Sequence, residues 1–260
     1  METPQGPPHP YLAAPPLAFA HRGGAAAGDE NTAGAFDRAV RAGYRYVETD
    51  VHATRDGVAV VLHDATLGRV AGDPHAVATM TWADLKSVRV GGAAAVPRLD
   101  EVLDAWPEVR FNIDVKADAA VEPTVAVVHE RATPDQVLLA SFSDPRLRRL
   151  RQLAGPAYAT SLAQRETARL WLASRVRRRI ALPPSAVAAQ VPIMFGRFRV
   201  VDRRFVTHAH ALGLQVHVWT VDDPAVMEGL LDLGVDGIMT DRIDVLREVF
   251  THRGLWKDRE

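Results

Sequence analysis

The sequence has no cysteine among its 260 residues. This absence excludes disulfide bonds, thiolate catalysis and cysteine-ligated zinc, so any bound metal has to be held by oxygen or imidazole ligands. No stretch approaches the roughly 18 consecutive apolar residues that a transmembrane helix needs. The proline-rich start, METPQGPPHPYLAAPPLAF, has neither a basic segment nor a continuous apolar core. We therefore expect no signal peptide, no stable membrane insertion and a cytoplasmic location.

The chain also lacks an excess of charge of either sign, with a formal net charge of -1. Without a global field there is no reason to expect nucleic acid or an anionic membrane as a partner. The nucleotide-binding patterns GxGxxG and GxxxxGK[ST] are absent as well. With 47% hydrophobic and 24% charged residues, the composition is that of an ordinary globular protein with a sizeable core. A homo-oligomer stays open.

What the sequence does contain is a regular alternation of short apolar runs and helical patterns. The first run is LAFA at 17–20, the second is YRYVETDV at 44–51, and eight such runs are each followed by a helical pattern. Eight βα units in about 240 residues predict a (β/α)₈ TIM barrel, with a doubly wound open sheet as the alternative. The run VAVVL at 58–62 lies too close to the second strand for a parallel crossover. Since it follows Asp56-Gly57, we expect a hairpin extension there.

The same sequence patterns predict where the segments of the chain begin and end. Residues 1–16 are predicted to be a flexible proline-rich arm, 17–250 the barrel, and 251–260 a C-terminal tail. A small insertion of about residues 64–97 follows the second strand, and TMTWADLKSV at 79–88 within it is expected to be one helix. The arginine runs at 146–151 and 175–179 are interpreted as solvated helix faces. Asn31 or Thr32 is expected to cap the first helix, and His217 to pack inside the barrel.

Ionisable residues stand where the strand-like runs end. Ionisable groups do not stabilise a buried strand, so their presence at the strand ends indicates a functional surface. In a barrel of this type that surface is the face formed by the carboxyl ends of the strands. Side chains alternate along a strand, so Glu48 shares a face with Asp50, and Asp114 shares one with Lys116. The strand ends supply His21-Arg22, Glu48-x-Asp50, His63, Asp114-x-Lys116, Trp219-Thr220 and Thr240-Asp241.

The chemistry of these groups is coherent. Three carboxylates from neighbouring strands suit a hard divalent cation such as Mg²⁺ or Ca²⁺. Arg22 and Lys116 match phosphate oxygens, the first as a fork and the second as a point charge. His21 and His63 provide a general acid and a general base on opposite sides of a scissile bond. The residues therefore predict a metal-assisted phosphodiester-cleaving site.

At these residues the chain resembles the glycerophosphodiester phosphodiesterase family. The resemblance implies a TIM barrel with a small insertion, and metal-dependent hydrolysis of glycerophosphodiesters to sn-glycerol 3-phosphate and an alcohol. It covers nearly everything from residue 17 to 244. The segments that carry it are AHRGG followed by ENT, YRYVETDVHATRDGVAVVLHD, VPRLDEVL before FNIDVK, ASFSDPRLRRL, HVWTVDDP and GVDGIMTDRID.

The resemblance also implies a role for each matching residue. Glu30 of ENT would lie at the metal or glycerol edge, and Trp219 would form an apolar wall for the substrate. Most members have glutamate where this chain has Asp114, a shorter side chain that leaves the metal preference open. The remaining implied roles are an acid/base pair of His21 and His63, metal ligands Glu48, Asp50 and Asp114, and phosphate contacts from Arg22 and Lys116.

Two other functions compete with this one. A barrel without catalytic activity would bind phosphodiesters in a regulatory role, but such a protein would be expected to lose a ligand or one histidine. A lysophospholipase D-like activity on lysolipids would need an apolar surface beside the mouth of the barrel. The insertion segment VATMTWADL, at 77–85, is a candidate for that surface.

Overall fold

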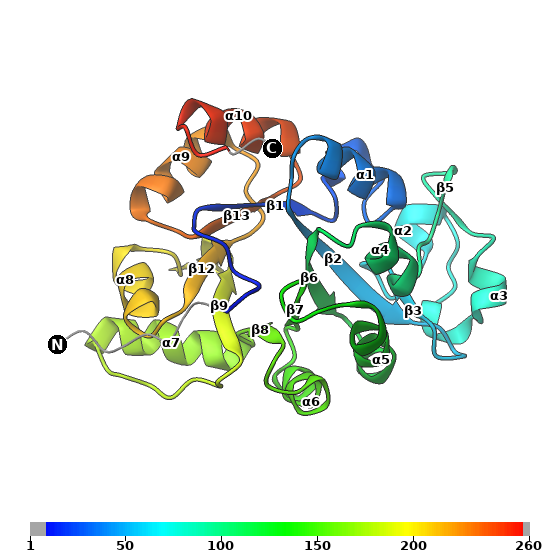
Figure 1. Cartoon of the computed structure of the whole chain (residues 1–260), viewed down its shortest axis with the longest axis horizontal. Helices are drawn as coiled ribbons and strands as arrows, with labels where there is room; N and C mark the ends of the chain where they lie inside the picture. The colour runs from blue at the N-terminus through cyan, green and yellow to red at the C-terminus, as the bar shows by residue number, and fades with distance from the viewer. Residues whose placement is uncertain (1–8, 257–260) are drawn as a thin grey trace.

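Eight parallel strands form a ring in which the first strand pairs with both the second and the last (Figure 1). The computed structural model describes residues 9–256. The predicted (β/α)₈ barrel is thereby confirmed, and no open edge remains between β1 and β13. The barrel strands are β1 (Leu17–His21), β2 (Tyr46–Ala53), β6 (Arg110–Val115), β7 (Val137–Ala140), β8 (Ala159–Ser161), β9 (Ala186–Val191), β12 (Gln215–Val218) and β13 (Gly237–Thr240).

A helix separates each barrel strand from the next and covers the outside of the ring (Figure 1). Several begin at a side chain that accepts a hydrogen bond from the first turn: Thr32 caps α1, Ser143 caps α6 and Asp223 caps α9. The helices are α1 (Ala33–Arg41), α4 (Leu99–Ala105), α5 (Val121–Arg131), α6 (Asp144–Ala154), α7 (Gln164–Val176), α8 (Arg203–Ala211), α9 (Pro224–Leu233) and α10 (Ile243–His252). Three single-turn 3₁₀ helices are Ala25–Ala27, Val77–Thr79 and Asp118–Ala120.

The predicted hairpin extension is also present. Strand β3 (Ala59–Val61) runs antiparallel to the end of β2, with Val51 opposite Val61. The chain then forms the insertion, whose own small hydrophobic cluster includes Leu67, Val77 and Leu85. The insertion's short elements are α2 (Gly68–Ala71), α3 (Trp82–Leu85), β4 (Arg89–Val90) and β5 (Ala94–Ala95).

The prediction of one helix over 79–88 is wrong. Helix α3 is a single turn, because Thr81 caps it in a capping box with Asp84 and the preceding Met80 is extended. A helix that starts at Trp82 cannot include residues before its cap. The turn is over by Leu85.

The interior of the barrel is apolar at one end and ionisable at the other. Residues two apart on a strand point to the same side. Along β2 the inward positions therefore run from Tyr46, in the apolar interior cluster, to Glu48 and Asp50. The same succession leads from Phe19 to His21 on β1. A second, larger core fills the space between the outer face of the strands and the helices.

The two ends of the chain pack more closely than predicted. Tyr11 is fully buried against Tyr46, whose hydroxyl donates to the Tyr11 carbonyl, so the prediction of a flexible arm is wrong at this point. An aromatic side chain within the proline-rich segment supplies the anchor. Trp256 packs edge-on against Tyr44. The rest of the predicted arm and tail, residues 1–8 and 257–260, lies outside the described residues.

One further hairpin, β10 (Met194–Phe195) with β11 (Phe198–Arg199), follows the carboxyl end of β9. It was not expected from the sequence. No helix within residues 9–256 has the length and hydropathy needed to cross a bilayer.

Candidate active site

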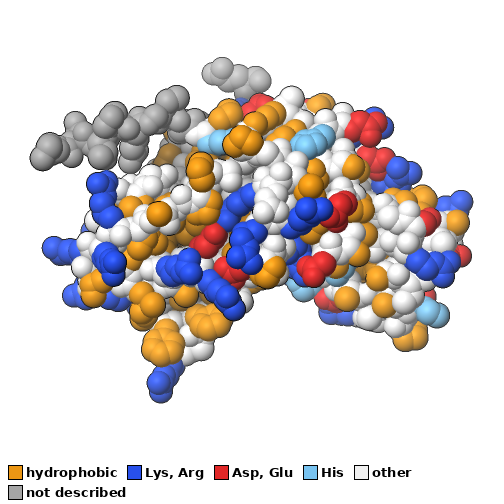
Figure 2. Space-filling model, turned by 90° about the horizontal axis from the view of Figure 1, so that it is seen from below, with side chains coloured by type: hydrophobic (Ala, Val, Ile, Leu, Met, Phe, Trp, Pro, Cys, Tyr) orange, Lys and Arg blue, Asp and Glu red, His pale blue; other side chains and the backbone are white. Residues whose placement is uncertain are grey.

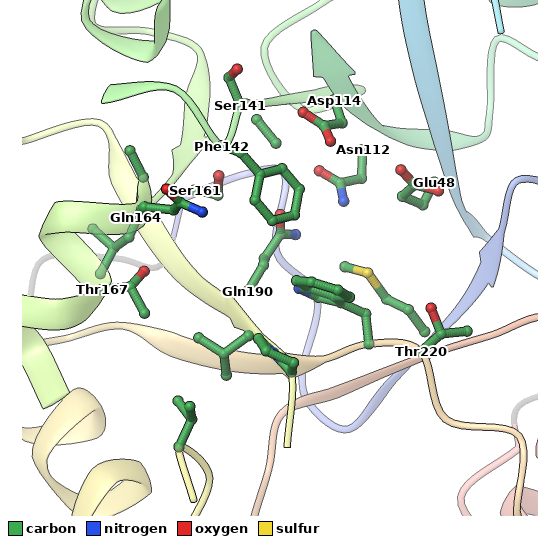
Figure 3. Close-up of a pocket in the computed structure, with 18 of the residues that line it drawn as sticks. Glu48, Asn112, Asp114, Ser141, Phe142, Ser161, Gln164, Thr167, Gln190 and Thr220 are labelled. Atoms are coloured by element: carbon green, nitrogen blue, oxygen red, sulfur yellow. The ribbon is translucent and has the colours of Figure 1, made fainter. Parts of the chain in front are cut away.

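A cavity of about 620 Å³ opens at the carboxyl ends of the barrel strands. In Figure 3 the carboxylates of Glu48 and Asp114 lie at one end of it, with Gln164 and Thr167 at the other. Of the nine residues predicted to form the site, eight line this cavity and one does not. Those that line it are His21, Arg22, Glu48, Asp50, His63, Asp114, Lys116 and Trp219.

The first of these residues are positioned by a sharp turn after β1. Arg22, Gly23 and Gly24 follow one another in the left-handed region, with φ of 52°, 81° and 90°. Such a turn favours glycine, and a Cβ on Gly23 would meet the Phe36 ring at 2.8 Å. The turn directs Arg22 back over the strand end, where its Nε lies 3.2 Å from Asp50 Oδ2.

The acidic residues come from two neighbouring strands. In the β2–β6 register Asp50 lies opposite Asp114, and Glu48 lies opposite Asn112. All four side chains are buried. Buried carboxylates require compensation by cations or hydrogen-bond donors, because the interior solvates charge poorly.

Lys116 provides part of that compensation. Its Nζ lies 2.8 Å from Asp50 Oδ1 and 2.7 Å from Asp114 Oδ2. Burial raises the pKa of Asp50, but the charges of Lys116 and Arg22 outweigh it, so the net pKa is lowered. For Asp114 burial prevails over Lys116, and the pKa of that carboxyl is raised.

The surroundings of Glu48 disfavour its ionised form. Burial and the neighbouring charge of Asp50 raise its pKa to about 7. Nearby, Asp114 Oδ1 and Asn112 Oδ1 are buried acceptors without a hydrogen-bond partner. An excess of hard oxygen acceptors in a buried acidic site matches the ligand chemistry of Mg²⁺ or Ca²⁺.

The arrangement differs from the predicted convergence in one respect. Within the described part of the chain, no three histidine or acidic side chains gather in a geometry that would hold an ion. Lys116 lies between two of the three carboxylates, because it follows Asp114 by two residues and shares its face of the strand. The oxygen donors suit a hard cation by their chemistry, but in this structure Lys116 is the counter-ion of Asp50 and Asp114.

Each of the two histidines pairs with an aspartate through Nδ1. His21 Nδ1 lies 2.6 Å from Asp241 Oδ1, and His63 Nδ1 lies 2.6 Å from Asp64 Oδ1. Burial lowers the pKa of His21, but the Glu48 charge and the Asp241 hydrogen bond outweigh it, so the net pKa is raised. An aspartate on Nδ1 fixes the orientation of the ring and makes Nε2 the nitrogen available for proton transfer.

Comparison with known proteins decides the family. The model of the glycerophosphoryl diester phosphodiesterase family matches residues 21–245. The probable glycerophosphodiester phosphodiesterase 2 of Mycobacterium tuberculosis is 42% identical over 245 residues, which cover 92% of each chain. The chain belongs to the glycerophosphoryl diester phosphodiesterase family. The predicted family membership is confirmed.

Solved structures agree in fold. A glycerophosphodiester phosphodiesterase from Agrobacterium tumefaciens has a TM-score of 0.76 at 26% identity, covering 90% of this chain and 99% of that one. An Oleispira antarctica phosphodiesterase, in complex with the product sn-glycerol-3-phosphate, has a TM-score of 0.77 at 21% identity. Its alignment covers 91% of this chain and 97% of that chain. Phosphodiesterases of this family thus share the barrel described above.

Within this phosphodiesterase, Glu30 is the predicted site residue that does not line the cavity. Its carboxylate instead joins Arg22, at 3.0 Å, to Arg69 of the insertion, at 2.7 Å. Glu30 was predicted to lie at the metal or glycerol edge of the site. Its side chain does not lie there in the structure. Glu30 forms ion pairs with both arginines, and of these Arg22 lines the cavity.

The neighbour Asn31 has a role that the sequence did not reveal. Expected as a candidate cap, it instead donates from Nδ2 to Asp50 Oδ2 and accepts from Thr49 at Oδ1. Its backbone is left-handed, with φ of 57°, which asparagine tolerates. The adjacent Thr32 takes the cap. The residues of ENT thus supply an ion pair, an amide that donates to Asp50 and a helix cap.

Part of the apolar side of the cavity comes from elements that were not predicted to supply it. Trp219 is present, and its ring meets Phe142 edge-on at 5.4 Å. Trp171, Phe195 and Phe198 also line the cavity, from α7 and the β10–β11 hairpin. The insertion segment at 77–85 does not supply this surface, because Val77 and Leu85 are buried in the insertion's own cluster.

Proposed function

We propose that this phosphodiesterase hydrolyses glycerophosphodiesters to sn-glycerol 3-phosphate and an alcohol. One observation carries the proposal: a single cavity joins two aspartate-paired histidines, the cations of Arg22 and Lys116, and three buried carboxylates. Its volume of about 620 Å³ is ample for a glycerophosphodiester. The sn-glycerol 3-phosphate bound in the Oleispira antarctica phosphodiesterase supports the same product.

Arg22 and Lys116 would bind and orient the phosphate. Both cations are already committed to buried carboxylates, Arg22 to Asp50 and Lys116 to Asp50 and Asp114. This network fixes the two positive groups before substrate arrives. Preorganised positive groups aimed at developing charge lower the barrier without reorganisation during the reaction.

His21 and His63 would move the protons. One imidazole removes the proton of the attacking hydroxyl. Attack by water gives sn-glycerol 3-phosphate directly, whereas attack by the glycerol 2-hydroxyl of the substrate gives a cyclic phosphate that water then opens to the same product. The other gives a proton to the departing alkoxide. Asp241 and Asp64 hold the respective rings so that Nε2 is the reacting nitrogen. Each role is worth roughly 10²–10⁴-fold in rate.

A divalent cation, Mg²⁺ or Ca²⁺, would be held by Glu48, Asp50 and Asp114. When bound it would neutralise charge on the phosphoryl oxygens as a Lewis acid. The raised pKa values of Glu48 and Asp114 support this, because acidic groups that burial makes costly to ionise are stabilised by a nearby cation.

A coupled enzymatic assay for sn-glycerol 3-phosphate tests the function. The wild-type protein is expected to release it from glycerophosphocholine, and His21→Ala and His63→Ala are each expected to lose roughly 10²–10⁴-fold in kcat. His252→Ala, an exposed histidine at the end of α10, is the matched control and should keep full activity. Near-full activity of either site variant would refute the two-histidine scheme. No release from any headgroup would favour the binding protein.

A lysophospholipase D-like activity is the second candidate, and a specific observation favours it. The outer part of the cavity is apolar, with Phe142, Trp171 and Phe195 along it. An acyl chain could lie there while the phosphate meets Arg22. If so, Phe195→Ser lowers kcat/KM for lysophosphatidylcholine and leaves that for glycerophosphocholine unchanged. An equal effect on both substrates would count against it.

A further inference from the structure

The β10–β11 hairpin exposes more apolar surface than a soluble protein ordinarily leaves in one place. Phe195 is 66% exposed, Phe198 51% and Met194 47%. Figure 2 shows this projection at the lower edge of the molecule, hydrophobic along its length with basic side chains at its tip and around it. The hairpin lies beside the cavity mouth, since both phenylalanines also line the cavity.

Helix α7 extends the same surface. Arg165, Arg169, Leu172 and Val176 recur at the spacing that places side chains on one helix face. Leu172 and Val176 are 60% and 70% exposed. These exposed aliphatic residues lie on the helix to which Trp171 joins the exposed aromatic hairpin. We call Leu172, Val176, Met194, Phe195 and Phe198 the apolar patch.

Trp171 fastens the hairpin to α7. Its Nε1 donates to the Arg199 carbonyl at 3.0 Å, and its ring meets Phe198 edge-on at 6.0 Å. The Arg175 guanidinium lies over the same ring, 4.6 Å from its centroid. The hairpin is therefore held in place relative to the helix, and the patch is presented as a formed surface.

Exposed arginines are concentrated in the same part of the chain as the apolar patch, and we call them the arginine collar. Between residues 164 and 204 the sequence has ten arginines and only two acidic residues, although the whole chain has a net charge of -1. Both acids are paired, Glu166 with Arg151 and Asp202 with Arg175. The exposed members of the collar are Arg165, Arg169, Arg177, Arg178, Arg179, Arg197, Arg199, Arg203 and Arg204.

We propose that the apolar patch and its arginine collar dock the protein onto an anionic lipid bilayer. Aromatic and aliphatic side chains enter the boundary between headgroups and acyl chains, while arginines pair with lipid phosphates. The collar argues against a second copy as occupant, because a two-fold contact would set arginines against arginines. Leu172 and Val176 argue against single-stranded nucleic acid, because aliphatic groups do not stack on bases.

Docking in this way turns the cavity mouth toward the bilayer. Phe195 and Phe198 belong both to the patch and to the cavity wall. The arrangement is peripheral, and no helix among the described residues 9–256 could span the bilayer. It concerns a binding surface and is testable whether or not the proposed hydrolysis is correct.

Co-sedimentation of the full chain with vesicles tests the proposal. We expect binding to phosphatidylcholine vesicles that contain phosphatidylglycerol, little binding to phosphatidylcholine alone, and weakening with salt. Phe195→Ser with Phe198→Ser should weaken binding by about tenfold or more. Arg178→Glu with Arg179→Glu should also weaken it, by about fivefold for each arginine removed. Leu172→Ser with Val176→Ser, at solvent-facing helix positions, tests the apolar term without disturbing the hairpin.

Matched controls separate the patch from general surface effects. Val226→Ser removes an exposed apolar side chain on α9, and Arg45→Glu reverses a charge before β2, at the opposite end of the barrel. Both should bind vesicles as the wild type does. Because the chain has no cysteine, Arg197→Cys and Arg45→Cys each take a single environment-sensitive fluorophore. Only the label at 197 should shift to the blue on anionic vesicles.

Several results would overturn the proposal. One is the absence of association with anionic vesicles, and another is equal association with neutral ones. Binding that the patch and collar variants leave unchanged would do the same. A concentration-dependent dimer of the wild type in sedimentation velocity, abolished by Phe195→Ser with Phe198→Ser, would assign the patch to self-association instead.

Discussion

His21 Nδ1 and Asp241 Oδ1 lie 2.6 Å apart, although 220 residues separate them in the sequence. The two residues stand at the ends of β1 and β13, which pair side by side where the barrel closes. Closure of the fold therefore orients a proposed catalytic imidazole. A slip in that pairing would move the aspartate away from the ring.

Asp241→Asn is expected to lower kcat by about 10²-fold, within the range that positioned acid-base groups supply. An amide can donate to Nδ1 and so stabilise the wrong tautomer of His21, with less effect on substrate binding than on turnover. Steady-state kinetics on glycerophosphocholine measure the split between kcat and KM. Asp232→Asn, an exposed carboxylate paired with Arg253, serves as the control. An unchanged kcat in Asp241→Asn would show that the pair is only structural.

Asp114→Ala is expected to abolish cation-dependent turnover, whereas Asp114→Glu should retain it. The longer side chain keeps a carboxylate at the site and moves it by about one methylene, which should alter the ratio of rates with Mg²⁺ and Ca²⁺. Removal of metal by a chelator followed by titration with each cation measures this ratio. If Asp114→Ala responds to cations as the wild type does, Asp114 is not a ligand.

Acid should destabilise the fold through His217. This side chain is fully buried in the barrel interior, and burial lowers its pKa to about 4 from an ordinary value of 6.5. Between pH 6.5 and 4, His217 is therefore protonated in the unfolded chain but not in the folded one. The free energy of unfolding consequently falls as the pH drops through this range. The loss is at most about 3 kcal/mol. Urea unfolding of the wild type and of His217→Gln at several pH values measures this loss. If the free energy of unfolding falls equally steeply in both proteins between pH 6.5 and 4, His217 is not its cause.

Gly23→Ala should destabilise the protein more than Gly57→Ala. Both glycines have φ of 81°, so the backbone strain of the new residue is the same. A Cβ at Gly23 would lie 2.8 Å from Phe36, whereas nothing lies within 4 Å at Gly57. The overpacking should cost about 1–3 kcal/mol beyond the shared strain. Ala35 also lies 2.9 Å from that Cβ, so equal losses in thermal unfolding would mean that both Phe36 and Ala35 move aside freely.

Local patterns in the sequence were enough to predict most of the architecture. The alternation of apolar runs predicted the barrel, and the short spacing after Asp56-Gly57 predicted the β3 hairpin, because both depend on neighbouring residues. The pairing of His21 with Asp241 could not be predicted in this way. It depends on two strands at opposite ends of the chain, and no local pattern encodes such a contact.

Other features were missed for related reasons. The β10–β11 hairpin has strands of two residues, too short for any periodicity to show. The basic run at 175–179 was interpreted as a solvated helix face, and Arg177, Arg178 and Arg179 are exposed but lie beyond the end of α7. Glu30 was misplaced because the insertion brings Arg69 to it from 39 residues away. Catalytic roles, metal, cytoplasmic location and oligomeric state stay predictions.

The most direct measurement follows glycerophosphocholine by ³¹P nuclear magnetic resonance during incubation with the metal-loaded protein. The proposed function predicts that the diester resonance is replaced by that of sn-glycerol 3-phosphate, that chelator stops the conversion, and that His21→Ala and His63→Ala do not carry it out. Formation of phosphocholine instead, or conversion that continues unchanged after chelation and in both histidine variants, would contradict it.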